Sequence, residues 1–243
     1  MKKRIKARYI IGNENGRNVI YKNGEMIYED TEGTILEVGP KVYGEWQESE
    51  DLGNAVICPG FIDLDALGDI DHALIYGEQK TTKKFFWSEE YLKNGPVEAM
   101  TPEEEAFKSK YAYAQLISHG ITTAMPITCV YYKKAAETYE EMAAAAENAR
   151  ELGLRAYLGP SFISSMHIYD RADKKEYILP LENGKAGMKG LKRAEEFALK
   201  YDHWGSDLIR AVMVPERIEL QSEEVLLAAK KFAREHGLLM RLH

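Results

Sequence analysis

The stretch LISHGITTAM (residues 116–125) ends a helical pattern at Gly120 and continues directly into an apolar strand pattern. The same order recurs in ELGLRAYL (residues 151–158) and in HGLLMRL (residues 236–242). Glycine suits each helix end because the residue after the last turn often adopts a left-handed conformation, which is unfavourable for a residue with a Cβ atom. A repeated order of helix, glycine and strand predicts a parallel sheet with helical crossovers, which is the α/β class.

The helix starts support this interpretation. Thr101 and Pro102, followed by Glu104, form the sequence of a capping box with proline at the first helical position, which predicts a helix over residues 101–119. Ser222 with two glutamates behind it predicts another helix start, and a third helix is expected over residues 142–152. Five strands are expected, near residues 57–63, 121–126, 154–160, 208–214 and 238–242. They fit an open doubly wound sheet or part of a (β/α)₈ barrel.

The first 57 residues have a different pattern. Short strand signals at 8–11, 18–21, 25–28 and 34–38 are separated by turn signals at Asn23-Gly24, Glu32-Gly33 and Gly39-Pro40. This predicts a small N-terminal β-module over residues 1–57, followed by a second domain over residues 58–243. The module is too short for a full sandwich, so strands from elsewhere in a longer protein are expected to complete it.

The amino-acid composition limits the classes of function that the protein can have. The chain is 45% hydrophobic and 29% charged, which is ordinary for a globular protein. A formal charge of −7 argues against nucleic-acid binding, which depends on clustered Lys and Arg, and favours a small-molecule substrate. No apolar run is long enough for a signal peptide or a membrane span, which predicts a cytoplasmic protein without membrane contact. Cys58 and Cys129 are then expected to be reduced thiols.

Several segments together resemble the amidohydrolase superfamily of metal-dependent hydrolases. VICPGFID (residues 56–63) resembles the entry to the first barrel strand of that family, and GTILEVG (residues 33–39) resembles the end of its N-terminal β-module. The segments at residues 116–123, 153–156 and 222–243 resemble its second, third and fifth strand regions. Within the family, the sequence most resembles the cytosine-deaminase and triazine-hydrolase branch. The resemblance implies a partial TIM-like barrel of about five strands after a β-sandwich module. It also implies a hydrolase or deaminase acting on non-peptide C–N bonds of a small cyclic or amide substrate.

The resemblance also implies a divalent metal ion, such as Zn, Mn or Fe, at the C-terminal mouth of the barrel. The family places a His-x-His pair on the first strand, where this chain has Asp65-Ala66-Leu67. Asp65 can ligate through oxygen, whereas Leu67 cannot ligate. Nearby Asp69, Asp71 and His72 are further candidate ligands, and a carboxylate-rich site would favour harder ions such as Mn²⁺ or Mg²⁺. The alternative is that these three residues belong to a turn and the protein surface.

His243 matches the metal-ligating histidine at the end of the fifth strand of the family. His167, after the expected third strand, is a candidate substrate-binding residue, with a solvated loop histidine as the alternative. The family's general base, an aspartate after the eighth strand, would lie beyond residue 243, so the catalytic residue is not identified here. The chain is accordingly expected to be an N-terminal fragment that is inactive alone, and the full-length protein could form a homo-oligomer.

Two other functions remain open at this point. The altered Asp65-Ala66-Leu67 motif is compatible with a non-catalytic relative that keeps the barrel and binds a ligand without turnover. A complete flavodoxin-like binding domain would also contain five parallel strands.

Overall fold

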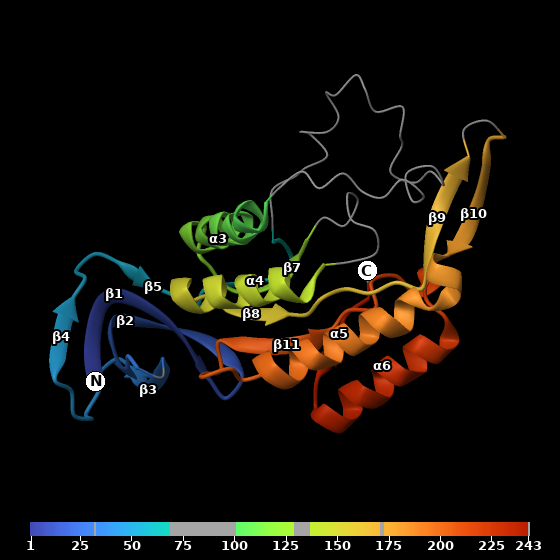
Figure 1. Cartoon of the computed structure of the whole chain (residues 1–243). Coiled ribbons are helices and arrows are strands. Elements are labelled where there is room, and N and C mark those ends of the chain that lie inside the picture. Colours follow the sequence, from blue (N-terminus) through green and yellow to red (C-terminus); the bar gives the residue numbers. More distant parts are fainter. Residues whose placement is uncertain (32, 69–100, 129–136, 171–172, 243) are drawn as a thin grey trace, which may run out of the picture. The chain divides into compact units, whose positions relative to one another are not determined.

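The computed structural model describes residues 1–31, 33–68, 101–128, 137–170 and 173–242 (Figure 1). The chain divides into two compact units, Met1–Phe61 and Ile62–His243, and each is described by itself below. None of the helices in the described ranges is long and apolar enough to cross a membrane.

The N-terminal unit is a five-stranded sheet built around two long strands. Its strands are β1 (Lys2–Glu14), β2 (Arg17–Glu29), β3 (Thr34–Gly39), β4 (Glu48–Asp51) and β5 (Val56–Ile57). The order is β3-β2-β1-β4, with β5 also pairing with β1; β1, β2 and β3 are antiparallel neighbours, while β4 and β5 run parallel to β1. Ala7, Ile10 and Tyr21 form its small core.

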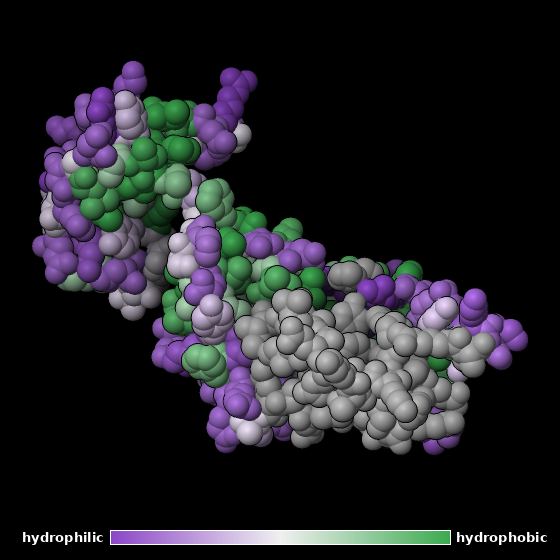
Figure 2. Space-filling view, turned by 90° about the horizontal axis from the view of Figure 1, so that it is seen from above, coloured by the Kyte–Doolittle hydropathy of each residue, from purple (hydrophilic) through white to green (hydrophobic). Residues whose placement is uncertain are grey.

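Considerable apolar surface remains exposed on this unit (Figure 2). Ile20, Ile35 and Tyr43 are among its exposed large side chains, at 65%, 59% and 79% exposure. A single layer of sheet can bury only one face by itself, so the other face stays in contact with solvent.

The turn predicted at Asn23-Gly24 is wrong. The hairpin between β1 and β2 turns at Asn15 and Gly16, with φ of 50° and 80°, between the paired residues Glu14 and Arg17. Asn23 also has a positive φ of 49°, but the strand continues through it, because pairing with β1 resumes on both sides. The two short strands expected over 18–21 and 25–28 are therefore one strand with a local irregularity.

The second unit contains five strands in one sheet: β6 (Phe61–Leu67), β7 (Ile121–Ile127), β8 (Arg155–Leu158), β11 (Ile209–Met213) and β12 (Leu239–Met240). Their order is β12-β11-β8-β7-β6, and the pairs β7 with β8, β8 with β11 and β11 with β12 are parallel. The strands run in chain order across a curled sheet, which is a partial TIM-like barrel and confirms the predicted fold class. An open doubly wound sheet would instead reverse its strand order at a switch point.

In the described part of the chain, four α-helices accompany the sheet: α3 (Pro102–Ser118), α4 (Tyr139–Leu152), α5 (Ala186–Tyr201) and α6 (Glu223–His236). Thr101 caps α3 in a reciprocal capping box with Glu104, as predicted. Gly153 and Gly237 end α4 and α6 in the left-handed conformation, also as predicted. α4 begins three residues before its predicted start, because Thr138 caps it by accepting a hydrogen bond from the backbone N–H of Glu141.

Consecutive helices pack side by side along the sheet (Figure 1). Alanines of α4, including Ala146 and Ala149, are fully buried in a cluster with residues of β8 and β11, and their small size brings this helix close to those strands. Leu191 of α5 and Ala229 of α6 belong to a second cluster with Met213 of β11. The core therefore lies between the helices and one face of the sheet, which leaves the strand ends to carry polar residues.

An antiparallel hairpin of β9 (Ser165–Asp170) and β10 (Lys175–Pro180) follows β8 and was not predicted. Ile168 on β9 is buried, and together with Leu181 it contributes to a separate apolar cluster. The hairpin projects away from the five-stranded sheet (Figure 1). The segment expected to be a loop around His167 is thus a strand.

Candidate functional site

Polar side chains gather where the strands of the five-stranded sheet end. Asp65 lies near the end of β6, Thr128 follows β7, Ser161 follows β8, Glu216 follows β11 and Arg241 follows β12. The carboxyl ends of parallel strands meet at one edge of a sheet, and in barrel enzymes that edge carries the active site. The fold therefore brings together residues that are up to 176 positions apart in the sequence.

Arg241 connects four strands at this edge. Its backbone N–H donates to the carbonyl of Met213 on β11 at 2.9 Å. Its Nη1 donates to the carbonyls of Met125 and Pro126 on β7 at 3.1 and 3.2 Å, and its Nη2 donates to Oδ1 of Asp65 on β6 at 2.6 Å. The Arg241 side chain is 12% exposed and that of Asp65 is 72% exposed.

This arrangement depends on the curl of the sheet. β12 and β6 are the two outermost strands in the sheet order, yet one side chain reaches from the first to the last. In a flat sheet, strands four places apart would be separated by about 19 Å, which exceeds the reach of an arginine. The ion pair between Arg241 and Asp65 therefore crosses the concave side of the half-barrel. We call this interaction the Arg241 clasp.

Glu137 forms a second polar connection at the same edge. Glu137 lies just before α4 and is 5% exposed. Its carboxylate accepts hydrogen bonds from the backbone N–H of Ser161 at 2.7 Å, from the Ser161 hydroxyl and from the Thr128 hydroxyl. A buried carboxylate with three donors is well satisfied, and it fixes the loop after β7 to the loop after β8.

The pKa values of two arginines near Glu137 are shifted by burial and by neighbouring carboxylates. Burial lowers the pKa of Arg241, while Asp65 and Glu137 oppose that effect. Burial also lowers the pKa of Arg193 on α5, and Glu137 again opposes it. Both guanidinium groups remain protonated at neutral pH, because arginine is not deprotonated in proteins. Arg193 donates from Nη2 to the Ser161 carbonyl at 3.3 Å, whereas its buried Nε has no partner among the described residues.

Glu216, also at this edge, has a raised pKa. Its side chain is 21% exposed, and burial raises its pKa, with a smaller contribution from Glu137; Arg217, whose Nε lies 3.7 Å away, opposes the shift. A carboxyl group with a raised pKa at the mouth of a barrel is suited to proton transfer.

Replacing Glu216 with glutamine should stabilise the protein at pH 7.5 and have little effect near pH 4. The raised pKa means that the folded state binds the proton more tightly than the unfolded state does. This group's contribution to stability is therefore fully present below its unfolded pKa and is lost as the pH rises through its folded pKa. Urea unfolding of both proteins at the two pH values measures the difference. An equal gain at both values would attribute the effect to packing instead of ionisation.

The residues predicted as site residues lie in different places. Asp65 is at the strand edge, while Asp69, Asp71, His72 and His243 lie outside the described residues. His167 is on β9, where its half-exposed ring has Nε2 at 3.5 Å from a carboxylate oxygen of Glu176 on β10.

The described donors do not by themselves form a metal site. Within the described ranges, no three residues among His, Cys, Asp and Glu are grouped so that they could hold a metal ion. Asp65 is already engaged with Arg241 through Oδ1, and Glu137 is occupied by its serine and threonine partners. A metal site at this edge would need donors from outside the described ranges.

Sequence reasoning missed the residues that organise this edge. Arg241 stands in an apolar strand pattern, and Glu137 stands just before a helix start. Position was a signal for Arg241, because polar residues immediately beyond β-strands of a barrel belong to its functional face. Glu137 lies ten residues after the end of β7 and has no such signal.

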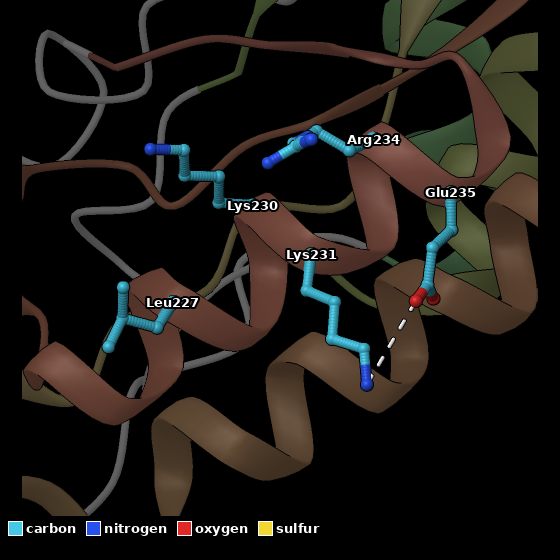
Figure 3. A pocket seen from close by; sticks show the side chains of 5 residues that line it. All are labelled: Leu227, Lys230, Lys231, Arg234 and Glu235. Carbon is cyan, nitrogen blue, oxygen red and sulfur yellow. Dashed lines mark ion pairs between the residues drawn. The ribbon is translucent and has the colours of Figure 1, made fainter.

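A shallow groove of about 530 Å³ lies elsewhere, along α6. It is lined by Leu227, Lys230, Lys231, Arg234 and Glu235, all on that one helix (Figure 3). Lys231 and Glu235 form an exposed ion pair at 3.9 Å, which contributes little to stability. The groove shares no residue with the strand edge and is not the candidate site.

Comparison with known proteins supports the fold assignment. No protein-family model matches the chain, and no curated protein matches it significantly. Solved structures do match, and deaminases and hydrolases are among them. One of them is guanine deaminase from C. acetobutylicum with bound guanine, at 18% identity and a TM-score of 0.68. The match covers all of this chain and 53% of the guanine deaminase chain.

Two further structures match in the same way. An amidohydrolase from a Sargasso Sea environmental sample has 19% identity and a TM-score of 0.66. The match covers all of this chain and 53% of that one. An adenosine deaminase from Xanthomonas campestris with bound zinc has 13% identity and a TM-score of 0.56; 99% of this chain covers 48% of that one. The chain thus shares the fold of these enzymes and spans about half their length.

Proposed function

We propose that this chain is part of a metal-dependent hydrolase or deaminase of the amidohydrolase superfamily. The observation that carries the proposal is the half-barrel whose strand ends gather Asp65, Glu137, Glu216 and Arg241 at one edge. The matched structures support it, because they include a guanine deaminase with guanine and an adenosine deaminase with zinc. The substrate is then a small cyclic or amide compound with a non-peptide C–N bond.

The proposed ligands of the metal are Asp65 and His243, with Asp69, Asp71 and His72 as further candidates. A divalent ion, when bound, lowers the pKa of a coordinated water and polarises the bond to be cleaved. This chain's own residues would orient and confine the substrate. Glu137 holds two strand-end loops together, Glu216 can exchange a proton at its carboxyl group, and His167 is proposed to contact the substrate.

The matched enzymes are about twice as long as this chain, so the proposed activity belongs to a longer protein in which further βα units complete the barrel. By itself the 243-residue chain is proposed to be inactive. In the longer protein a homo-oligomer is compatible with the proposal.

A second candidate function is ligand binding without turnover. Two features favour it: Leu67 stands where the family has a ligating histidine, and the Asp65 carboxylate is paired with Arg241. Such a protein would keep the barrel and its polar edge but would not release a product.

Formation of a hydrolysis product distinguishes the two functions. The complete product of the reading frame that contains this chain would be loaded with Mn²⁺ or Zn²⁺ and assayed with purine bases, triazines and cyclic amides. The proposal predicts ammonia from a purine base or a triazine, or a ring-opened carboxylate from a cyclic amide, loss of that activity with a chelator, and no activity from the 243-residue chain. Substrate-dependent stabilisation without ammonia and without any ring-opened product would instead establish the binding function. The variant Glu147→Gln, at an exposed position in the middle of α4, serves as the unaffected control.

A further inference from the structure

The strand β6 is poorly buried for a strand of a barrel. Ile62, Leu64 and Leu67 on β6 are 67%, 61% and 71% exposed, and Ala66 is the one residue of this strand that is buried. In β11, by contrast, four of the five residues are buried. Apolar burial is what fixes a strand against its helices, so among the described residues β6 is held by few such contacts.

The Arg241 clasp supplies polar contacts at this weakly held strand. Nη2 of Arg241 donates to Oδ1 of Asp65 on β6 at 2.6 Å, which is the length of a short charge-assisted hydrogen bond. Nη1 donates to the carbonyls of Met125 and Pro126 on β7, and the backbone N–H of Arg241 donates to the carbonyl of Met213 on β11. One residue at the end of β12 therefore joins β6 and β7 to β11 across the sheet.

Burial of the guanidinium gives the clasp a preferred state. The Arg241 side chain is 12% exposed, and Asp65 is the carboxylate that pairs with it. If β6 moved away, the two β7 carbonyls would still accept hydrogen bonds, but a largely buried positive charge would lose its counterion. An unpaired buried charge is unfavourable, so Arg241 favours the position of β6 in which Asp65 reaches it.

We propose that the Arg241 clasp is a strap that holds β6 in place from the concave side of the half-barrel. The strands β8 and β11 are instead held by apolar contacts with the helices. Loss of the clasp releases β6 while β8 and β11 keep their structure. The inference goes beyond the proposed function, because the strap requires neither a metal nor a substrate.

Two variants and one matched control test the strap. Arg241→Met keeps an unbranched side chain but has no N–H donors, whereas Asp65→Ala removes only the bond to β6. The control is Asp63→Ala, because Asp63 is the same residue type on the same face of the same strand. Its Oδ1 accepts from the backbone N–H of Asp65 at 3.1 Å, and it makes no hydrogen bond or ion pair to another strand within the described part of the chain.

Hydrogen–deuterium exchange of the 243-residue chain, followed by mass spectrometry, measures the effect. Peptides that cover residues 61–68 report on β6, and peptides that cover residues 209–213 serve as the internal reference for β11. Amides exchange when their segment opens, so exchange in β6 should become about tenfold faster or more in Arg241→Met and in Asp65→Ala. Exchange in β11 should stay unchanged in both, and Asp63→Ala should match the wild type at both strands.

Asp65→Ala decides the proposal even if Arg241→Met does not fold, because the Asp65 side chain is 72% exposed and its removal leaves no cavity. Unchanged exchange in β6 of Asp65→Ala overturns the strap, and so does an equal increase in Asp63→Ala. An increase of the same size in β6 and β11 also overturns it, since the clasp would then stabilise the whole unit instead of one strand.

Discussion

Replacing Gly159 with alanine should reduce the free energy of unfolding by about 3 kcal/mol or more. Gly159 follows β8 and is buried, and a Cβ atom there would lie 2.0 Å from the carbonyl oxygen of Val212 on the neighbouring strand β11. The obstacle is backbone, which cannot rotate away as a side chain would. The two parallel strands would have to separate at the polar edge, where Ser161 is held two residues further along.

The matched control is Gly237→Ala. Gly237 has a φ of 66° at the end of α6, but apart from its neighbours in the chain no atom lies within 4 Å of its added Cβ. Only backbone strain applies there, and about 1 kcal/mol is expected. Urea unfolding followed by circular dichroism compares the two variants. If Gly159→Ala were no less stable than Gly237→Ala, the close approach of β8 and β11 would not exist in solution.

The helix ends and the parallel strands were predictable because they depend on neighbouring residues. A serine or threonine side chain caps a helix by bonding to an N–H three residues away, as Thr101 and Ser222 do. Glycine ends a helix by adopting a conformation unfavourable to other residues, as Gly153 and Gly237 do. Both kinds of helix end depend on residues close together in the sequence, so the order of helix, glycine and strand could be predicted from the sequence.

The hairpin turn in the first unit was not decided locally. Asn15-Gly16 and Asn23-Gly24 are the same dipeptide, and both asparagines have a positive φ. Asn15-Gly16 becomes the turn because the chain folds back there with Glu14 opposite Arg17, and this register carries β2 past Asn23 alongside β1. The choice follows from the pairing of two 13-residue strands, which the dipeptide alone does not encode.

The candidate site was predictable only in part for the same reason. Asp65 was identified by its place after a strand and by the resemblance of the residues before it. Its partner Arg241 lies 176 residues away, and the contact exists only because the sheet curls until its outermost strands face each other. Glu137 likewise acquires its partner Ser161 from 24 residues away. Neither contact leaves a pattern in the sequence near these residues.

Replacing Glu137 with alanine should cost about 3 kcal/mol of stability, close to the cost expected for Gly159→Ala but for a chemical instead of a steric reason. Glu137 is 5% exposed, and its carboxylate accepts from the Ser161 N–H and from the Ser161 and Thr128 hydroxyls. Without the carboxylate, the buried Ser161 donors and the partly buried Thr128 hydroxyl lose their acceptor.

The control for this prediction is Glu147→Ala, at an exposed position of α4, which should change the free energy of unfolding by less than about 0.5 kcal/mol. Glu137→Gln adds a test of charge, since an amide keeps one carbonyl acceptor but has lost the negative charge near Arg193 and Arg241. The free energy of unfolding of Glu137→Gln, measured with urea, should therefore lie between the values of the wild type and Glu137→Ala. If Glu137→Gln were as stable as the wild type, hydrogen bonding alone would account for the role of Glu137. If Glu137→Ala were also as stable, the strand-end loops would be held together by other contacts, and Glu137 would be free to serve the proposed chemistry directly.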